Sequence, residues 1–199
     1  MTKNLLMIFT RNPELGKCKT RLAATIGDQA ALDIYKFLLE HTVSITQNLQ
    51  VDKQVHYSVK VREHDIWDAQ TYIKKQQNGE DLGIRMEHAF ADGFTQGYQN
   101  IIIIGSDMYD LSQKDLQNAF EALENNDYVV GPAEDGGYYL FGMKSLNSHV
   151  FKNKEWGTNT VLKDTLEDIK DSSVKILEER NDVDYYEDIK DIEVFQKFF

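Results

Sequence analysis

The fold class follows from one segment, Ile101-Ile102-Ile103-Ile104-Gly105-Ser106-Asp107. Four consecutive β-branched side chains favour an extended backbone, and an unbroken apolar run is typical of a strand buried on both faces of a sheet. Gly105 and Ser106 mark the end of this strand. Because ligands of open α/β sheets bind beyond the carboxyl ends of the strands, we expect Asp107 to lie at the centre of a functional site.

Strand and helix patterns alternate on both sides of this segment. Apolar or alternating runs predict further strands over residues 5–9, 53–59, 71–76, 128–132, 138–143 and 174–177. Helical spacing predicts helices over residues 28–49, 82–94, 112–123, 158–169 and 186–199. This alternation predicts the α/β class, with a mostly parallel sheet flanked by helices. The turn Asp135-Gly136-Gly137 predicts at least one antiparallel strand, so we expect a mixed sheet.

Composition limits the organisation of the chain and its partners. The 199 residues contain no linker-like or repetitive segment, so we expect a single domain over residues 1–199. A net charge of −11 argues against nucleic acid as a partner, because a polyanion would be repelled. The lone Cys18 and the lack of a long apolar run predict a cytoplasmic protein that does not enter a membrane. The sequence leaves a homodimer open.

Charged residues follow several of the predicted strands. Acids follow three of them, as Asp107, as Glu134 and Asp135, and as Asp182 and Asp184. Cations follow the first strand, at Arg11, Lys17, Lys19 and Arg21. Two carboxylates ~4 Å apart repel by about 4 kcal/mol at an effective dielectric constant of 20, so we expect Mg²⁺ or Mn²⁺ between them. The basic loop, which contains Gly16, would contact phosphates, and the pattern therefore predicts a metal–diphosphate site. A single aspartate more often caps a helix, as we expect of Asp28 and Asp110.

Two common nucleotide-binding motifs are absent. A phosphate-binding P-loop would need Gly at position 11 and Ser or Thr at position 18, where this chain has Arg11 and Cys18. No GxGxxG sequence follows the first strand. The five histidines are scattered without metal-ligand spacing, and we interpret them as surface or packing residues.

Six segments together resemble a known family in their order and spacing. They are FTRNPELGKCKTRL (9–22), DLGIRM (81–86), GSDMYDL (105–111), GPAEDGGYYLFG (131–142), WGT (156–158) and DVD (182–184). The chain resembles the glycosyltransferase-A-like family described as radical-SAM/selenodomain-associated transferase 1. More distantly it is similar to phospholactate and molybdenum-cofactor guanylyltransferases. The resemblance covers nearly the whole chain, and its most specific segment is GPAEDGGYYL.

The resemblance implies a single-domain nucleotide-diphospho-sugar transferase (GT-A) fold with seven strands. It implies Asp107 and Asp184 as ligands of Mg²⁺ or Mn²⁺, and Asp135 as the general base or acceptor anchor, with Lys19 and Arg21 assisting catalysis. The implied nucleotide-binding residues are Thr10, Arg11, Gly16, Lys17, Lys19, Arg21, Leu82, Gly83, Arg85 and Ser106. The implied acceptor side comprises Glu134, Gly136, Gly137, Trp156 and Thr158. Two positions depart from the family pattern, with Tyr109 in place of a proline and Tyr185 in place of a threonine.

The implied activity is metal-dependent transfer of a glycosyl group from a nucleotide-diphospho-sugar to a small-molecule acceptor. One alternative is a nucleotidyltransferase that uses a nucleoside triphosphate and releases pyrophosphate. A second alternative is a nucleotide-binding module without catalysis. The chain lacks an LxGGxGxRM-like opening, which favours sugar transfer over nucleotidyl transfer.

Overall fold

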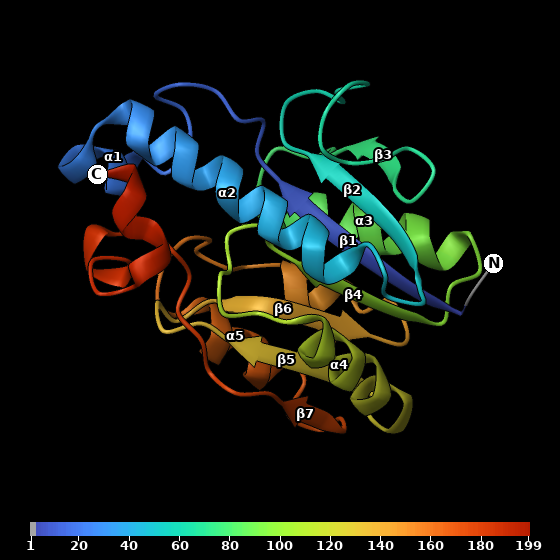
Figure 1. The fold of residues 1–199 in the computed structure, drawn as a ribbon. Coiled ribbons are helices and arrows are strands. Elements are labelled where there is room, and N and C mark those ends of the chain that lie inside the picture. The colour runs from blue at the N-terminus through green and yellow to red at the C-terminus, as the bar shows by residue number, and fades with distance from the viewer. Residues whose placement is uncertain (1–2) are drawn as a thin grey trace.

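The computed structural model describes residues 3–199, and within them seven strands form one twisted sheet (Figure 1). The strand order is β3-β2-β1-β4-β6-β5-β7. The strands are β1 (Asn4–Thr10), β2 (Asp52–Tyr57), β3 (Ile73–Gln76), β4 (Asn100–Ile104), β5 (Tyr128–Pro132), β6 (Tyr138–Met143) and β7 (Val174–Ile176). All neighbours pair in parallel except β6, which is antiparallel to both β4 and β5. The predicted mixed, mostly parallel sheet is therefore confirmed.

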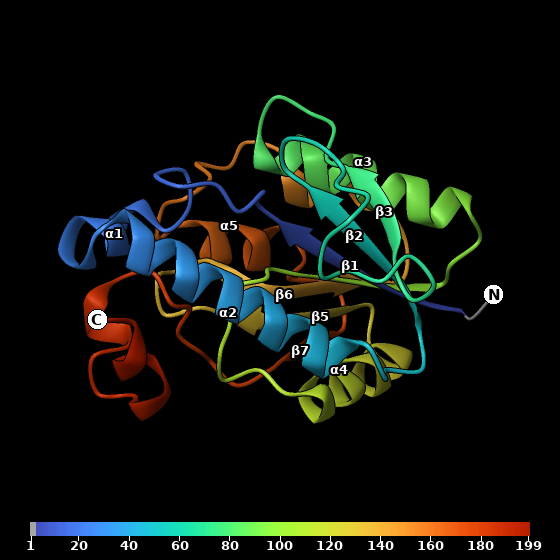
Figure 2. The ribbon, with the colours of Figure 1, turned by 45° about the horizontal axis from the view of Figure 1, so that its top comes forward.

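Helices cover both faces of the sheet, as the two ribbon views show (Figures 1 and 2). On one face, α2 (Asp28–Thr46) and α4 (Gln113–Asn125) share an apolar core with β1 and β4. On the other face, α3 (Leu82–Thr95), α5 (Val161–Asp168) and the 3₁₀ helix η1 (Ser148–Phe151) form a second core. Side chains alternate along β1, so Leu6 and Ile8 face α2 while Leu5 and Met7 face α3. This alternation gives a three-layer α/β/α arrangement.

The C-terminal segment differs from its prediction. We expected one helix over residues 186–199, but the chain forms two short 3₁₀ helices, η2 (Tyr186–Asp188) and η3 (Glu193–Phe198). The Asp188 carboxylate accepts hydrogen bonds from the backbone N–H groups of Asp184 and Tyr185, at 2.9 and 2.6 Å, and Ile192 is extended with φ −98°. This capping competes with a continuous helix. The segment packs against α2 and the unpredicted short helix α1 (Thr20–Ile26) through a third apolar cluster.

Polar termini hold two of the helices in the predicted positions. The Ser112 side chain and Asp115 form a reciprocal capping box at the start of α4. The Asp81 carboxylate accepts a hydrogen bond from the Ile84 N–H at 2.8 Å and caps α3. Within residues 3–199, no helix combines the length and apolarity that crossing a bilayer requires.

Candidate active site

The carboxyl ends of β1, β4, β5 and β7 lie at one edge of the sheet, because these strands run in the same direction. β4 lies between β1 and β6, and its four isoleucines are buried, so the chain leaves the core at Gly105. The segment that follows carries Asp107 to the rim of the sheet. The predicted meeting of strand-end charges therefore has a structural basis in the strand directions.

Lys19 connects two of the acids across the chain. Its ammonium Nζ lies 2.9 Å from Asp107 Oδ2 and 3.2 Å from Asp184 Oδ1, and its side chain is 5% exposed. Burial alone would lower the pKa of Lys19, but the carboxylates of Asp107 and Asp184 raise it above its ordinary value. Burial likewise opposes ionisation of Asp107, yet the Lys19 ammonium holds the pKa of Asp107 below its ordinary value. Lys19 and Asp107 are therefore both charged at neutral pH.

The other cations of the basic loop point in different directions. Arg21 Nη1 lies 2.8 Å from Asp184 Oδ2 and is 53% exposed, so Arg21 covers the outer side of the same acid. Lys17 is 74% exposed and pairs with Glu14 at 2.9 Å, away from the strand-end acids. Gly16 is also exposed, on the outer part of the same loop. Arg11 lines a second cavity, on the α2 face of the sheet, that includes Trp67.

Thr10 and Ser106 form a buried hydrogen-bonded group below the loop. The Thr10 hydroxyl lies 3.2 Å from the Tyr35 hydroxyl and 3.2 Å from the Ser106 hydroxyl, and Tyr35 lies 3.3 Å from Ser106. The Tyr35 hydroxyl also accepts a hydrogen bond from the Arg11 N–H at 2.9 Å. These contacts join β1, α2 and the end of β4. The hydroxyls of Thr10 and Ser106, which we expect at the nucleotide, therefore also connect the start of the loop to the end of β4.

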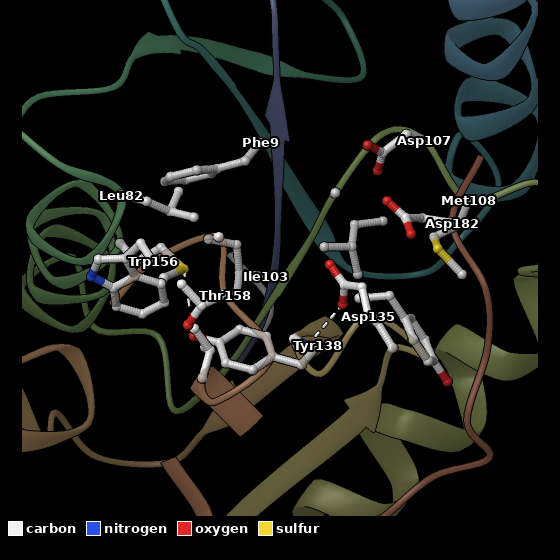
Figure 3. A pocket seen from close by; sticks show the side chains of 18 residues that line it. Phe9, Leu82, Ile103, Asp107, Met108, Asp135, Tyr138, Trp156, Thr158 and Asp182 are labelled. Carbon is white, nitrogen blue, oxygen red and sulfur yellow. Dashed lines mark hydrogen bonds between the residues drawn. The ribbon is translucent and has the colours of Figure 1, made fainter. Parts of the chain in front are cut away.

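A cavity of about 260 Å³ lies beside the strand-end acids. In Figure 3, the carboxylates of Asp107, Asp182 and Asp135 gather on one side of this cavity. Aromatic and aliphatic side chains face them from the other side, at Phe9, Leu82, Tyr138 and Trp156. The cavity therefore joins a charged wall to an apolar wall, which suits a ligand with a polar end and a flat body.

Asp182 also lines this cavity, although it was not among the expected metal ligands. Burial and, next in size, the nearby Asp107 carboxylate together raise the pKa of Asp182 to about 6. The sequence contained a signal for Asp182, because it stands in the motif Asp182-Val183-Asp184 and therefore follows the end of β7, as Asp184 does. Val183 is buried between the two acids and anchors the motif in the third apolar cluster.

The turn after β5 positions Asp135. Its Oδ1 accepts a hydrogen bond from the Gly137 N–H at 2.8 Å. Gly136 has φ +85°, and a Cβ there would lie 2.4 Å from the Asn159 carbonyl oxygen, so only glycine fits. This close approach brings the 156–161 segment, with Trp156 and Thr158, to the same cavity as Asp135. Glu134 is exposed and does not line the cavity.

The first turn of α3 contributes one lining residue. Leu82 lines the cavity, whereas the Arg85 side chain donates a hydrogen bond to the Gly79 carbonyl at 2.8 Å. A Cβ on Gly83 would lie 2.5 Å from Trp156 Nε1, so Gly83 allows the indole to pack against the helix. Arg85 and Gly83 thus shape the site, and Leu82 lines the cavity itself.

The two departures from the family pattern lie outside the cavity. Tyr109 packs among Phe37, His41 and Phe195, with ring centroids 5.0–5.8 Å away. Tyr185 is exposed, and the Arg21 guanidinium lies 5.5 Å from its ring centroid. Neither tyrosine lines the space between the carboxylates and Trp156.

The donor set suits a hard divalent cation in its chemistry. Asp107, Asp182 and Asp184 offer only oxygen atoms, and burial, followed by the nearby Asp107 carboxylate, raises the pKa of Asp182. Among residues 3–199, no three acidic, histidine or cysteine side chains already converge as a metal site. The Lys19 ammonium lies between Asp107 and Asp184, within 3.2 Å of each.

Comparisons with known proteins agree with this architecture. The family model described as "Uncharacterized protein conserved in bacteria (DUF2064)" matches residues 41–158. A protein of Desulfovibrio desulfuricans G20, provisionally named a nucleotide-diphospho-sugar transferase, is 29% identical and has a TM-score of 0.85 over 98% of this chain and 91% of that one. No curated protein matches the chain.

Two further solved structures share the fold at low identity. Rv0371c from Mycobacterium tuberculosis H37Rv is 14% identical, with a TM-score of 0.61 over 95% of this chain and 97% of that one. Rv0371c is also known in complex with manganese. The 4-diphosphocytidyl-2C-methyl-D-erythritol synthase from Anaerococcus prevotii DSM 20548 is 10% identical, with a TM-score of 0.62 over 98% and 97% of the two chains.

Proposed function

We infer the function from two facts: the chain belongs to the DUF2064 family of bacterial proteins, and it has the fold of a nucleotide-diphospho-sugar transferase. We propose that it is a metal-dependent transferase whose donor is a nucleotide-diphospho-sugar. One observation carries the proposal. Asp107 lines the charged wall of a cavity whose other wall is aromatic, and the buried Lys19 links Asp107 to Asp184. The name of the Desulfovibrio protein supports the same class of substrate.

In this proposal the acids at the strand ends hold the cation. Asp107 and Asp184, with Asp182 beside them, would bind Mg²⁺ or Mn²⁺, which neutralises the diphosphate when bound. The structure of Rv0371c with manganese supports the choice of metal at the level of a shared fold. Lys19 and Arg21 bind the phosphate oxygens, where the departing diphosphate gains negative charge. Such preorganised charge often supplies the largest part of catalysis.

The acceptor binds on the other side of the donor. Asp135 is the general base, because the Gly137 N–H fixes Oδ1 and leaves Oδ2 to accept the proton of the acceptor hydroxyl. Trp156 and Tyr138 exclude water and offer flat apolar faces to a sugar or an acceptor ring. The Thr158 hydroxyl, which lies 3.1 Å from that of Thr160, orients polar groups at this wall.

The test compares products as well as rates. Purified protein with Mn²⁺ and a panel of small hydroxyl- and phosphate-bearing acceptors is incubated with nucleotide-diphospho-sugars or with nucleoside triphosphates, and release of nucleoside diphosphate or of pyrophosphate is measured. Release of nucleoside diphosphate from one sugar donor is expected, whereas release of pyrophosphate alone would identify the nucleotidyltransferase alternative. Nucleotide binding without either product would identify a non-catalytic module.

Two aspartates on the same segment provide a matched pair of variants. Asp107→Asn should lower turnover by roughly a hundredfold or more, because it removes the acid that Lys19 and the metal share. Asp110→Asn is the control, since Asp110 pairs with Arg180 at 3.4 Å and does not line the cavity. Equal activity of both variants would overturn the assignment of Asp107.

A further inference from the structure

Lys19 occupies the place between two proposed metal ligands. Its ammonium lies within 3.2 Å of both Asp107 and Asp184, and only 5% of the side chain is exposed. One ammonium therefore bridges two carboxylates from distant parts of the chain, as a divalent cation would. A metal ion and this ammonium cannot both stay there, because they would compete for the same oxygen atoms and repel each other.

The backbone at Lys19 supports a functional role for this contact. Lys19 has φ 50° and ψ 46°, a left-handed conformation that a side chain with a Cβ adopts at a cost. The Lys19 carbonyl accepts a hydrogen bond from the Ala23 N–H at 2.8 Å, and the neighbouring Leu22 on α1 is buried, so this conformation is held in place. The backbone is thus fixed, whereas the long lysine side chain has several rotatable bonds and can reach another partner.

The balance of charge supports an exchange as well. Asp107, Asp182 and Asp184 lie together, and the cations in contact with them are Lys19 and Arg21. Arg21 contacts the outer oxygen of Asp184 and leaves the space between Asp184 and Asp107 to Lys19. If Lys19 left without replacement, the acids would repel one another, so its departure requires an incoming cation.

We propose that Lys19 is the resting counter-ion of the metal site, and that a divalent cation takes its place only as Lys19 moves to a phosphate of the bound nucleotide. This inference rests on the proposed function and adds an order to it. Metal binding and nucleotide binding are therefore coupled. The metal gives the acids a new cation in place of Lys19, and the nucleotide phosphate gives Lys19 a new anion in place of the acids. Without nucleotide, Lys19 suppresses metal binding.

The first experiment measures binding of the metal alone. Mn²⁺ is titrated into metal-free protein, and free Mn²⁺ is followed by its electron paramagnetic resonance signal. Lys19→Met should bind Mn²⁺ about 5- to 150-fold more tightly than the wild type, the usual range for coupled sites. Lys17→Met is the matched control, because it removes the same charge from an exposed part of the same loop and should change the affinity by no more than about twofold.

A second variant guards against misfolding. Lys19→Gln keeps a side chain that donates hydrogen bonds to Asp107, removes the positive charge and should also bind Mn²⁺ more tightly than the wild type. Circular dichroism and a cooperative thermal transition establish that each variant is folded. A structural ion pair without exchange would give unchanged or weaker Mn²⁺ binding in both Lys19 variants, and that result would overturn the proposal.

The second experiment measures the coupling. The same titrations are repeated with the diphosphates of adenosine, cytidine, guanosine and uridine, each corrected with a protein-free titration. In the wild type the preferred diphosphate should tighten Mn²⁺ binding about 5- to 150-fold, and in Lys19→Met this gain should shrink. An equal gain in both proteins would overturn the exchange while leaving the transferase proposal intact. No Mn²⁺ binding by any protein under any condition would instead overturn the metal site itself.

Discussion

His56 should make the fold sensitive to mild acid. The residue lies on β2, its side chain is buried, and its ring stacks on Phe9 of β1 with centroids 5.2 Å apart. Burial and the nearby Lys75 ammonium lower the pKa of His56 to about 4. The unfolded chain has a histidine pKa of about 6.5. The contribution of the neutral His56 to the free energy of unfolding is therefore fully present above about pH 6.5. It is lost as the pH falls toward 4, because in this range only the unfolded chain takes up the proton.

The size of the effect follows from the two pKa values. A pH of 5 lies about 1.5 units below the pKa of the unfolded histidine, which is therefore protonated, while the folded histidine is still neutral. Each unit corresponds to about 1.36 kcal/mol, so the wild type should lose about 2 kcal/mol between pH 7.5 and pH 5 through this residue alone. For a chain of this length, that loss lowers the melting temperature by about 4–8 °C.

The test is a double difference between two proteins and two pH values. Urea unfolding is measured for the wild type and for His56→Gln, which stays neutral at every pH and can still bond Gln54, 3.1 Å from His56 Nε2. The free energy of unfolding of the wild type should fall by about 2 kcal/mol more than that of the variant. The destabilisation caused by any cavity in the variant cancels, because each protein is compared with itself at the two pH values. Equal losses in both proteins would refute the burial argument, since His56 would then titrate alike in the folded and unfolded chains.

Three further substitutions test the site and its supports. Asp182→Asn should stabilise the metal-free protein by ~1–2 kcal/mol at pH 8, because the pKa of Asp182 is raised to about 6 and its ionised form is therefore unfavourable in the fold. This magnitude allows for the partial exposure of the side chain. Thermal unfolding in EDTA should show that the gain in stability decreases below pH 6. Gly136→Ala should destabilise the fold by about 2 kcal/mol or more, because a Cβ would lie 2.4 Å from the Asn159 carbonyl oxygen, and a urea midpoint equal to that of the wild type would contradict the close approach. Ser112→Ala should cost about 1 kcal/mol through the lost cap of α4, with transferase activity unchanged, and a drop in activity at constant stability would contradict a purely structural role.

Most of the sheet could be predicted because its strands are locally encoded. The strands at 128–132 and 138–143 have the predicted bounds, and the antiparallel turn between them follows from Gly136 and Gly137. The isoleucines of β4 predicted a buried central strand. The prediction of a C-terminal helix was wrong. Its apolar spacing was outweighed by the Asp188 side chain, which accepts hydrogen bonds from the preceding backbone N–H groups of Asp184 and Tyr185. Apolar periodicity indicates which residues are buried, and it does not determine where the backbone hydrogen bonds go.

The site was predictable in its acids and less so in its contacts. Asp107, Asp135 and Asp184 could be named because strand direction brings carboxyl ends to one edge. Thr10 and Ser106 were expected to bind nucleotide, and only the fold shows that Tyr35 engages their hydroxyls. Tyr35 lies on α2, more than twenty residues away from either strand end.

The sequence by itself determined the class of sheet, the edge at which charge gathers and the signs of the charges there, because these depend on local patterns and on strand direction. Only the tertiary structure decided which cation meets which acid. Lys17 and Lys19 are two residues apart in one loop, yet one is exposed against Glu14 and the other is buried between Asp107 and Asp184. That difference arises from a left-handed backbone at Lys19 and from the packing of α1 against the C-terminal segment. Both depend on contacts between residues far apart in the chain, which no local pattern records.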